Sequence, residues 1–274
     1  MELKKHIDYS INEISPYINW IYFYHAWGLN GKPAAEREKL RAEAEDMLRE
    51  FQGRYLTHAV FGIFPANSDG DDLLVAGTRI PLLRQQRPAH EGEPNLCLSD
   101  FVRPLSSGKP DEVGLFATTV DAAMEQDYKG DAYRQLLSQT LADRLAEATA
   151  ERMHQQVRTT FWGYAQAEQL SMSELHLEHY QGIRPAVGYP SLPDTSLNFI
   201  LSGLIGMKDI GIRLTESGMM TPHASVSGFM FSHPQSRYFD LGKIGEDQLT
   251  DYARRRGIPV ELMRRFLESS LLKR

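Results

Sequence analysis

Residues 184–190 read Arg-Pro-Ala-Val-Gly-Tyr-Pro and combine side-chain types that suit a small-molecule site. Pro185 and Pro190 stiffen the segment, and Gly188 permits a positive φ or the close approach of a ligand to the backbone. Arg184 supplies a positive charge, while Tyr189 offers a flat apolar face with a polar tip. These groups suit a nucleoside ligand. A surface turn with a half-buried tyrosine is the alternative interpretation.

Other patterns that bind cofactors or metals do not occur in the sequence. The chain has no G-x-G-x-x-G turn of the kind that holds nucleotide cofactors in parallel α/β folds. His176 and His179 have helical spacing, but no cysteine or third ligand lies near them in sequence. We therefore predict no metal site.

Short motifs in one order along almost the whole chain resemble those of the S-adenosylmethionine-binding reactivation domain of cobalamin-dependent methionine synthase. Arg184, Gly188 and Tyr189 match the cofactor signature of that family, Arg-x-x-x-Gly-Tyr. So many ordered matches make an accidental similarity improbable. The other matching segments are 17–20, 62–67, 70–72, 83–86, 97–102, 141–148, 161–165, 180–184, 214–217, 224–229, 231–234, 242–244 and 247–255.

The resemblance implies that the chain binds S-adenosylmethionine without the ordinary methyltransferase fold. The aromatic pair at 238 and 239 would attract the ligand's sulfonium by a cation–π interaction, unless it only packs into the core. Arg184 in a surface ion pair, and Glu147 on a solvated helix face, are the corresponding structural alternatives. The cofactor contacts implied by matching motif are Asn19, Glu147, Arg184, Ala186, Gly188, Tyr189, Tyr238 and Phe239.

Several positions depart from the family's pattern. Asn19 stands where the family has Asp, so its amide oxygen would accept a hydrogen bond from the ligand's ammonium without an opposing charge. We expect this change to weaken binding by about 1–2 kcal/mol. Phe239 replaces the second tyrosine of a Tyr-Tyr pair, His223 replaces a glycine near the expected pocket, and Thr195 replaces a histidine. These changes bear on affinity and on the geometry presented to cobalamin.

The resemblance also implies a role, the reductive methylation that reactivates oxidised cob(II)alamin. Such a domain positions the methyl donor and needs no protein acid, base or nucleophile, so we expect no catalytic residue. The corrinoid signature Asp-x-His-x-x-Gly does not occur, so cobalamin would be held by a separate methionine synthase polypeptide. A flavodoxin-like protein would supply the electron. The chain would then be a methyltransferase component, active only with its cobalamin-bearing partner. The alternative is a divergent module that binds a corrinoid protein or senses S-adenosylmethionine without methyl transfer.

Composition is typical of a soluble globular protein. The chain has 274 residues, 42% of them hydrophobic and 24% charged, and no linker or repeat, which favours a single domain over residues 1–274. A net charge of −6 argues against a nucleic-acid partner. The single cysteine cannot form an internal disulfide, and no apolar run approaches the 18 residues typical of a membrane span. We expect a cytoplasmic protein with no membrane partner.

The elements that must position these residues follow from hydrophobic periodicity. Apolar residues at helical spacing predict helices over 33–52 and about 131–160, the second with Leu136 on its inner side. Apolar runs at 59–64 and 73–76 flank a polar turn and predict a hairpin. The remaining predictions are strands at 113–117, 210–214 and 225–231, loops at 84–97 and 182–195, a helix at 197–205, and terminal helices at about 245–256 and 258–271.

These elements do not alternate as βαβ units, which argues against a parallel doubly wound sheet. We predict an α+β fold with an antiparallel sheet. The resemblance implies in addition that the domain is C-shaped, with a twisted antiparallel sheet flanked by helices.

Overall fold

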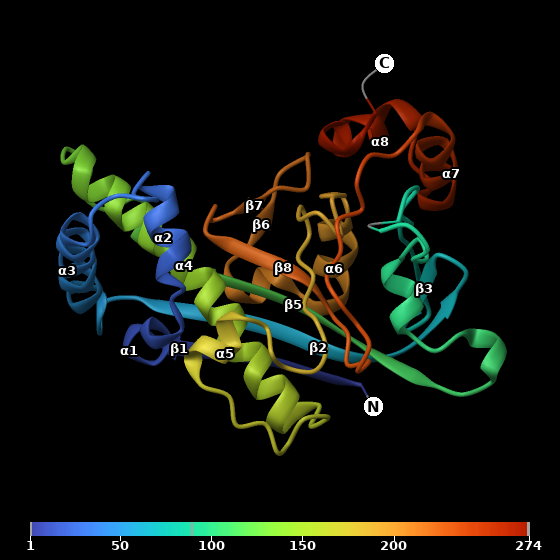
Figure 1. The fold of residues 1–274 in the computed structure, drawn as a ribbon, viewed down its shortest axis with the longest axis horizontal. Coiled ribbons are helices and arrows are strands. Elements are labelled where there is room, and N and C mark those ends of the chain that lie inside the picture. The colour runs from blue at the N-terminus through green and yellow to red at the C-terminus, as the bar shows by residue number, and fades with distance from the viewer. Residues whose placement is uncertain (1, 89, 273–274) are drawn as a thin grey trace.

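A computed structural model describes residues 2–88 and 90–272 of the chain (Figure 1). Within these residues, six antiparallel strands form the main sheet and β6 and β7 pair separately. The strands are β1 (Leu3–Ser10), β2 (Leu56–Asp69), β3 (Asp72–Val75), β4 (Thr78–Pro81), β5 (Asp111–Val120), β6 (Arg213–Leu214), β7 (Met220–Thr221) and β8 (Ser225–Met230).

Helices surround this sheet. The α-helices are α1 (Ile11–Ile14), α2 (Trp20–Ala26), α3 (Ala34–Phe51), α4 (Ala132–Gln156), α5 (Met172–His176), α6 (Leu197–Ile205), α7 (Glu246–Arg256) and α8 (Val260–Phe266). Short 3-10 helices are η1 (Ser15–Tyr17), η2 (Leu98–Phe101), η3 (Leu105–Ser107), η4 (Ala122–Glu125), η6 (Met207–Ile210) and η7 (Glu268–Ser270), and η5 (Val157–Phe161) is a π-helical turn.

The long strand β2 organises the main sheet, whose order is β4-β3-β2-β5-β8. β1 pairs with the first part of β2, and β3 pairs with its last four residues. β5 runs along β2 from Thr57 to Ala66, and β8 pairs with β5. All of these pairings are antiparallel, as the sequence predicts.

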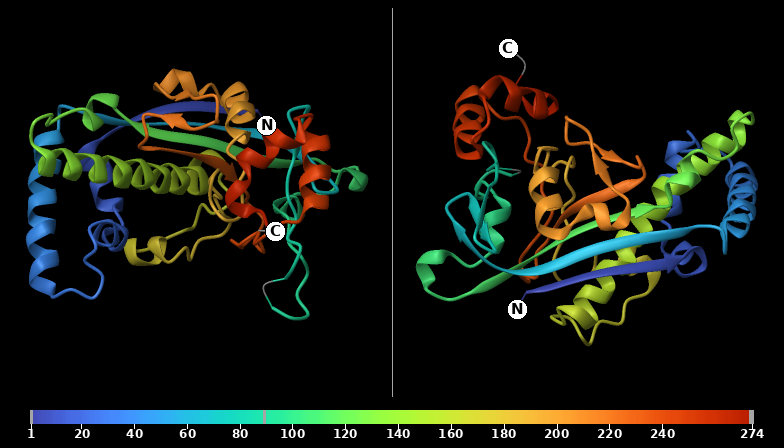
Figure 2. Two further views of the ribbon diagram at one scale, coloured as in Figure 1. Left: turned by 90° about the horizontal axis from the view of Figure 1, so that it is seen from above. Right: turned by 180° about the vertical axis from the view of Figure 1, so that it is seen from behind.

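The centre of the sheet is buried on both faces. Side chains of a strand alternate between its two faces. Phe61 and Phe116 pack into a hydrophobic cluster with α1 to α4, whereas Val60 and Leu115 pack into a second cluster with α6 and η6. The left view of Figure 2 shows α4 below the strands and α6 above them. Burial on both faces explains why β2 and β5 contain continuous apolar runs.

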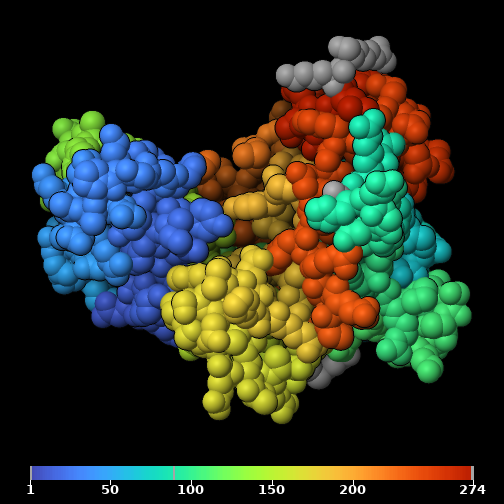
Figure 3. All heavy atoms as spheres, in the orientation of Figure 1, coloured from blue at the N-terminus to red at the C-terminus, as the bar shows by residue number. Residues whose placement is uncertain are grey.

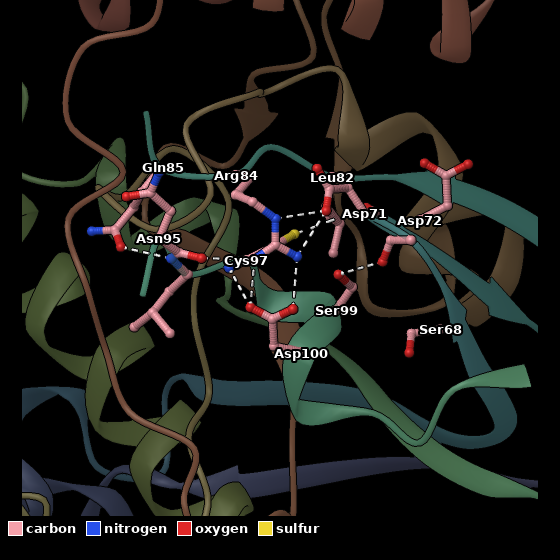
Figure 4. Close-up of polar contacts among 12 residues, drawn as sticks. Ser68, Asp71, Asp72, Leu82, Arg84, Gln85, Asn95, Cys97, Ser99 and Asp100 are labelled. Atoms are coloured by element: carbon pink, nitrogen blue, oxygen red, sulfur yellow. Dashed lines mark hydrogen bonds and ion pairs between the residues drawn. The ribbon is translucent and has the colours of Figure 1, made fainter. Parts of the chain in front are cut away.

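A cluster of polar contacts around Arg84 holds the loops beyond the β2–β3 hairpin (Figure 4). The Arg84 guanidinium donates to Asp71 at 2.8 Å and to both Asp100 carboxylate oxygens at 2.7 and 2.8 Å. Ser99 donates to the Gly70 carbonyl at 3.0 Å. The matched segments 70–72, 83–86 and 97–102 therefore meet here, where they order a lobe of the fold. Beside them α7 and α8 pack into a third hydrophobic cluster.

The molecule is C-shaped. Figure 3 shows a hollow between the blue N-terminal lobe and the red C-terminal lobe, with gold and orange atoms of the 180–230 part of the chain at its floor. The predicted class is confirmed: an α+β fold with a curled antiparallel sheet flanked by helices. No helix in the described part of the chain combines the length and the apolar character needed to cross a membrane.

Most predicted elements are confirmed, and three details are wrong. The helix predicted over about 258–271 is shorter, because α8 ends at Phe266 and the separate turn η7 follows it. Only two residues of the segment 210–214 form a strand, because Gly206 and Gly211 adopt left-handed φ values of 73° and 84° and enclose the helix η6. Leu136 is 52% exposed although its neighbour Leu137 is buried. The buried residues of this turn include Leu137, Ser138 and Leu141, so Leu136 lies on the solvent side of the helix.

Candidate functional site

The predicted ligand loop is docked on the edge of the main sheet. Ile183 exchanges two backbone hydrogen bonds with Phe231, at 2.9 and 3.0 Å, immediately after β8. The Val187 N–H donates to the Ser227 carbonyl at 2.8 Å. Ala186 lies opposite Gly228 of β8 and is buried. The loop thus pairs with the edge of β8 through isolated backbone bridges, which fix the position of its backbone.

The turn that follows is closed by its own backbone. Gly188 has a φ of +89°, a conformation that side chains disfavour, and its N–H donates to the Leu192 carbonyl at 2.8 Å. The Leu192 N–H in turn donates to the Tyr189 carbonyl at 2.8 Å. Tyr189 remains 50% exposed at the tip of this turn. The structure therefore confirms the positive φ of Gly188 and leaves part of the Tyr189 side chain accessible at the tip of the turn.

Arg184 points inward, toward α4. Its Nη2 donates to Glu151 Oε2 at 2.6 Å, and the two side chains are only 15% and 7% exposed. Burial opposes the guanidinium charge, but Glu151 and the surrounding groups outweigh it and hold the pKa of Arg184 well above its ordinary value. The alternative of a surface ion pair is therefore wrong in its location, because the pair is buried.

Tyr238 and Phe239 lie behind the loop. The Tyr238 hydroxyl accepts a hydrogen bond from the Arg184 backbone N–H at 3.0 Å. The Phe239 carbonyl accepts one from the Ser191 hydroxyl at 2.7 Å, and its ring packs against the α6-side cluster. Burial raises the pKa of Tyr238, so its hydroxyl stays protonated. The aromatic pair thus fixes both ends of the loop.

Glu147 stands one helical turn before Glu151 on α4 and contacts the tip of the loop. The Tyr189 hydroxyl donates to Glu147 Oε1 at 2.5 Å. Burial, and then Glu147, raise the pKa of Tyr189 above its ordinary value. One turn earlier on the same helix, Asp143 faces His223 at 3.5 Å. Asp143, Glu147 and Glu151 follow one another at four-residue spacing on α4, so His223 lies beside the same face of this helix. Its side chain is 82% exposed.

Asn19 has a local structural role. It is the N-cap of α2, and its side-chain oxygen accepts the Ile21 backbone N–H at 3.1 Å. Asparagine is among the preferred residues for this position because it satisfies an N–H that the helix leaves open. Among the described residues, the Asn19 side chain makes no hydrogen bond to the group around Arg184 and Glu147.

Sequence reasoning missed Glu151, the partner of Arg184. Glu151 is 6% exposed on the buried side of α4, between the buried Ala150 and Met153. Acidic side chains are seldom so buried unless a cation pairs with them, so its place on the inner face of a predicted helix was a usable signal. Below it, Arg158 is fully buried, donates to His154 Nδ1 at 2.8 Å and lies 3.9 Å from the Tyr180 ring centroid.

The fold and the site define the class of protein. It is a C-shaped α+β module in which Tyr189 of the 184–190 loop and Glu147 of α4 lie beside the buried pair of Arg184 and Glu151. The chain belongs to the family described as vitamin B12 dependent methionine synthase, activation domain, whose model matches residues 10–257. It is also similar to the crystal structure of the MetH reactivation domain bound to AdoHcy, with 38% sequence identity and a TM-score of 0.92. That match covers 99% of this chain and 91% of the other.

Proposed function

We propose that this chain binds S-adenosylmethionine and S-adenosylhomocysteine at the loop that carries Arg184, Gly188 and Tyr189. The observation that carries the proposal is the docking of this loop on β8, against the two carboxylates of α4. The relative that binds AdoHcy supports it, because it shares the fold over 99% of this chain.

Polar atoms below the loop fit a ligand of this kind. Glu151 Oε1 and Arg184 Nε are buried, and neither has a hydrogen-bond partner in the part of the chain that the structure describes. Buried polar atoms are normally satisfied, so a bound ligand or an ordered water is expected to reach them. S-Adenosylmethionine carries both an ammonium and a carboxylate, which complement this acceptor and this donor.

We assign the following roles. Glu147 attracts the ligand's ammonium, and the exposed ring of Tyr189 packs against the ligand. Arg184 acts through its backbone, by shaping the loop, and through Nε, the donor that its pair with Glu151 leaves open. Ala186 and Gly188 offer backbone contacts, and Tyr238 and Phe239 support the loop from behind. Asn19 contributes only if its amide oxygen accepts a second hydrogen bond.

The reaction we propose is the reductive methylation of cobalamin held on a separate methionine synthase polypeptide, with residues 1–274 acting as one unit. When bound, S-adenosylmethionine supplies the electrophilic methyl group. The residues of this chain bind and orient it, and no proton transfer by a side chain is needed. A flavodoxin-like protein remains the proposed electron donor.

Calorimetry tests the ligand. Both S-adenosylmethionine and S-adenosylhomocysteine should give saturable binding, whereas cobalamin should give none. Glu147→Gln should weaken binding about tenfold, the difference between a charged and a neutral hydrogen bond. Glu38→Gln, at an exposed position of α3, is the matched control and should leave affinity unchanged. A flat titration at millimolar ligand would remove the cofactor proposal.

Methyl transfer is tested with a client enzyme that lacks its own activation module. After oxidation to cob(II)alamin, turnover should return when this chain, S-adenosylmethionine and a reductant are added, and it should saturate with added chain. Labelled methyl should reach cobalt before it reaches methionine. If ligand binds but label never reaches the corrinoid, the sensing or corrinoid-protein-binding module becomes the better reading.

Asn19→Asp should leave the stability of α2 nearly unchanged, because Asp and Asn are equally good N-caps. If the ligand's ammonium lies against this side chain, affinity should rise by about 1–2 kcal/mol through the added charge. Calorimetry measures the affinity and thermal unfolding measures the stability. An unchanged affinity would show that Asn19 is a helix cap and does not touch the ligand.

A further inference from the structure

Two histidines and an aspartate gather on the sheet face opposite α4. His6 and Asp8 are two residues apart on β1 and so share one face of the strand, and the strand register places Asp8 directly opposite His58 of β2. The neighbouring Thr57 accepts a hydrogen bond from Thr149 of α4, so His58 points away from that helix. The trio therefore lies across the sheet from the Arg184–Glu151 pair.

The three side chains converge on one point. One ligand atom from each of His6, Asp8 and His58 lies within 4.8 Å of the other two. Asp8 Oδ1 is 2.8 Å from His6 Nε2 and 2.7 Å from His58 Nδ1. Two ligands of a tetrahedral zinc ion are about 3.4 Å apart, given bonds of about 2.0–2.1 Å. Side-chain movements of about 0.6–0.7 Å, which open these two contacts to about 3.4 Å, would admit an ion.

His58 lies between two carboxylates. Its Nδ1 faces Asp8 and its Nε2 faces Asp121 Oδ1 at 3.1 Å. Each ring nitrogen of His58 therefore has a carboxylate oxygen within hydrogen-bond distance. A cation between His58 Nδ1 and Asp8 would accept a lone pair from each of them.

Asp121 completes the pattern expected around a metal-binding histidine. Histidine ligands commonly donate the N–H of their other nitrogen to a carboxylate, which fixes the tautomer and the orientation of the ring. Asp121 is itself held, because its Oδ2 accepts the Leu56 backbone N–H at 2.7 Å. This arrangement directs His58 Nδ1 toward Asp8 and His6.

A cavity of about 280 Å³ adjoins the trio and is lined also by Asp121, Asp209 and Gly211. It leaves room for a water molecule as a further ligand. The surrounding charge favours a cation: Asp8, Asp121 and Asp209 all face the cavity, while Lys4 pairs with Asp209 at 3.6 Å. Two imidazoles and one carboxylate with an open position are donors that suit Zn²⁺ and related divalent transition ions.

We propose that His6, His58 and Asp8 bind one divalent transition-metal ion, with Asp121 as the positioning residue for His58. The ion joins β1 to β2 at a solvent-accessible position. This site is independent of the proposed S-adenosylmethionine site, because the two lie on opposite faces of the sheet.

The test uses the full chain without an affinity tag, freed of metal by a chelator and titrated with Zn²⁺ in a calorimeter. We expect one ion to bind per chain and, at 100 times the dissociation constant, a rise in the unfolding midpoint of about 5–10 °C. Asp121→Asn should weaken binding about 10–100-fold while every metal ligand remains in place. The Co²⁺-loaded chain should show visible absorption of a low-symmetry site.

His58→Ala should abolish this binding, and His6→Ala, at a side chain 41% exposed, gives a second variant if the first does not fold. His25→Ala, an exposed histidine of α2, is the matched control and should bind Zn²⁺ as the unaltered chain does. Binding that is absent, or that survives both cluster substitutions, overturns the proposal. S-Adenosylmethionine affinity should be the same with and without Zn²⁺, so failure of either proposal is visible separately.

Discussion

Arg184→Ala is expected to destabilise the fold by about 3–5 kcal/mol, as well as weakening any ligand binding. The change leaves Glu151 with a buried carboxylate and no cation, and an unpaired buried charge is costly. Urea unfolding followed by far-UV circular dichroism measures the loss. An ordinary loop arginine would cost far less, so the effect on stability distinguishes the buried pair from a surface contact.

Two further variants isolate the cause. Arg184→Met combined with Glu151→Leu removes both charges and should recover most of the lost stability, because apolar replacements of a buried ion pair are often neutral or stabilising. Arg49→Ala removes an exposed arginine paired with Asp46 on α3 and should change stability by less than about 1 kcal/mol. Equal losses from Arg184→Ala and Arg49→Ala would contradict the buried-pair interpretation. Ligand affinity of these variants has meaning only where they are shown to be folded.

Gly228→Ala should have an effect of similar size, by a steric route. An added Cβ would lie 2.2 Å from the Pro185 carbonyl oxygen and 2.9 Å from Ala186 Cα, both backbone atoms. The loop must therefore leave β8, which breaks the hydrogen bond from the Phe229 N–H to the Pro185 carbonyl. We expect a loss of about 3 kcal/mol, at the upper end for overpacking, and at least a tenfold loss of S-adenosylmethionine affinity.

Gly203→Ala is the matched control, because no atom lies within 4 Å of a Cβ built at this position of α6. Replacing a mid-helix glycine with alanine should raise stability by about 0.5–1 kcal/mol. Thermal unfolding measures the stability of both variants, and calorimetry measures their affinity for S-adenosylmethionine. If Gly228→Ala leaves both unchanged, close docking of the loop on β8 does not support the site.

The sequence by itself determined the longer helices, the hairpin and the family, but it did not indicate the short helices α1, α2 and α5. The helix predicted over 33–52 is α3, and the helix predicted over 197–205 coincides with α6. Hydrophobic periodicity records which face of an element is covered, so it identifies elements that pack along their whole length. It failed at Leu136, which faces solvent beside the buried Leu137, and at 210–214, where glycines in left-handed conformations interrupt the run.

For the site, the sequence predicted the loop over 182–195, but it did not indicate which residues of other elements the loop contacts. The types of residues in the 184–189 segment indicated a ligand loop, because glycine, proline and tyrosine have local conformational effects. Only the tertiary structure showed that Arg184 faces Glu151, and that β1 brings His6 and Asp8 to His58. These residues are 33 and about 50 positions apart. Electrostatic contacts depend on the distance between charged groups in space, and spacing along the chain does not give this distance. The register of the strands and the docking of the helices set it.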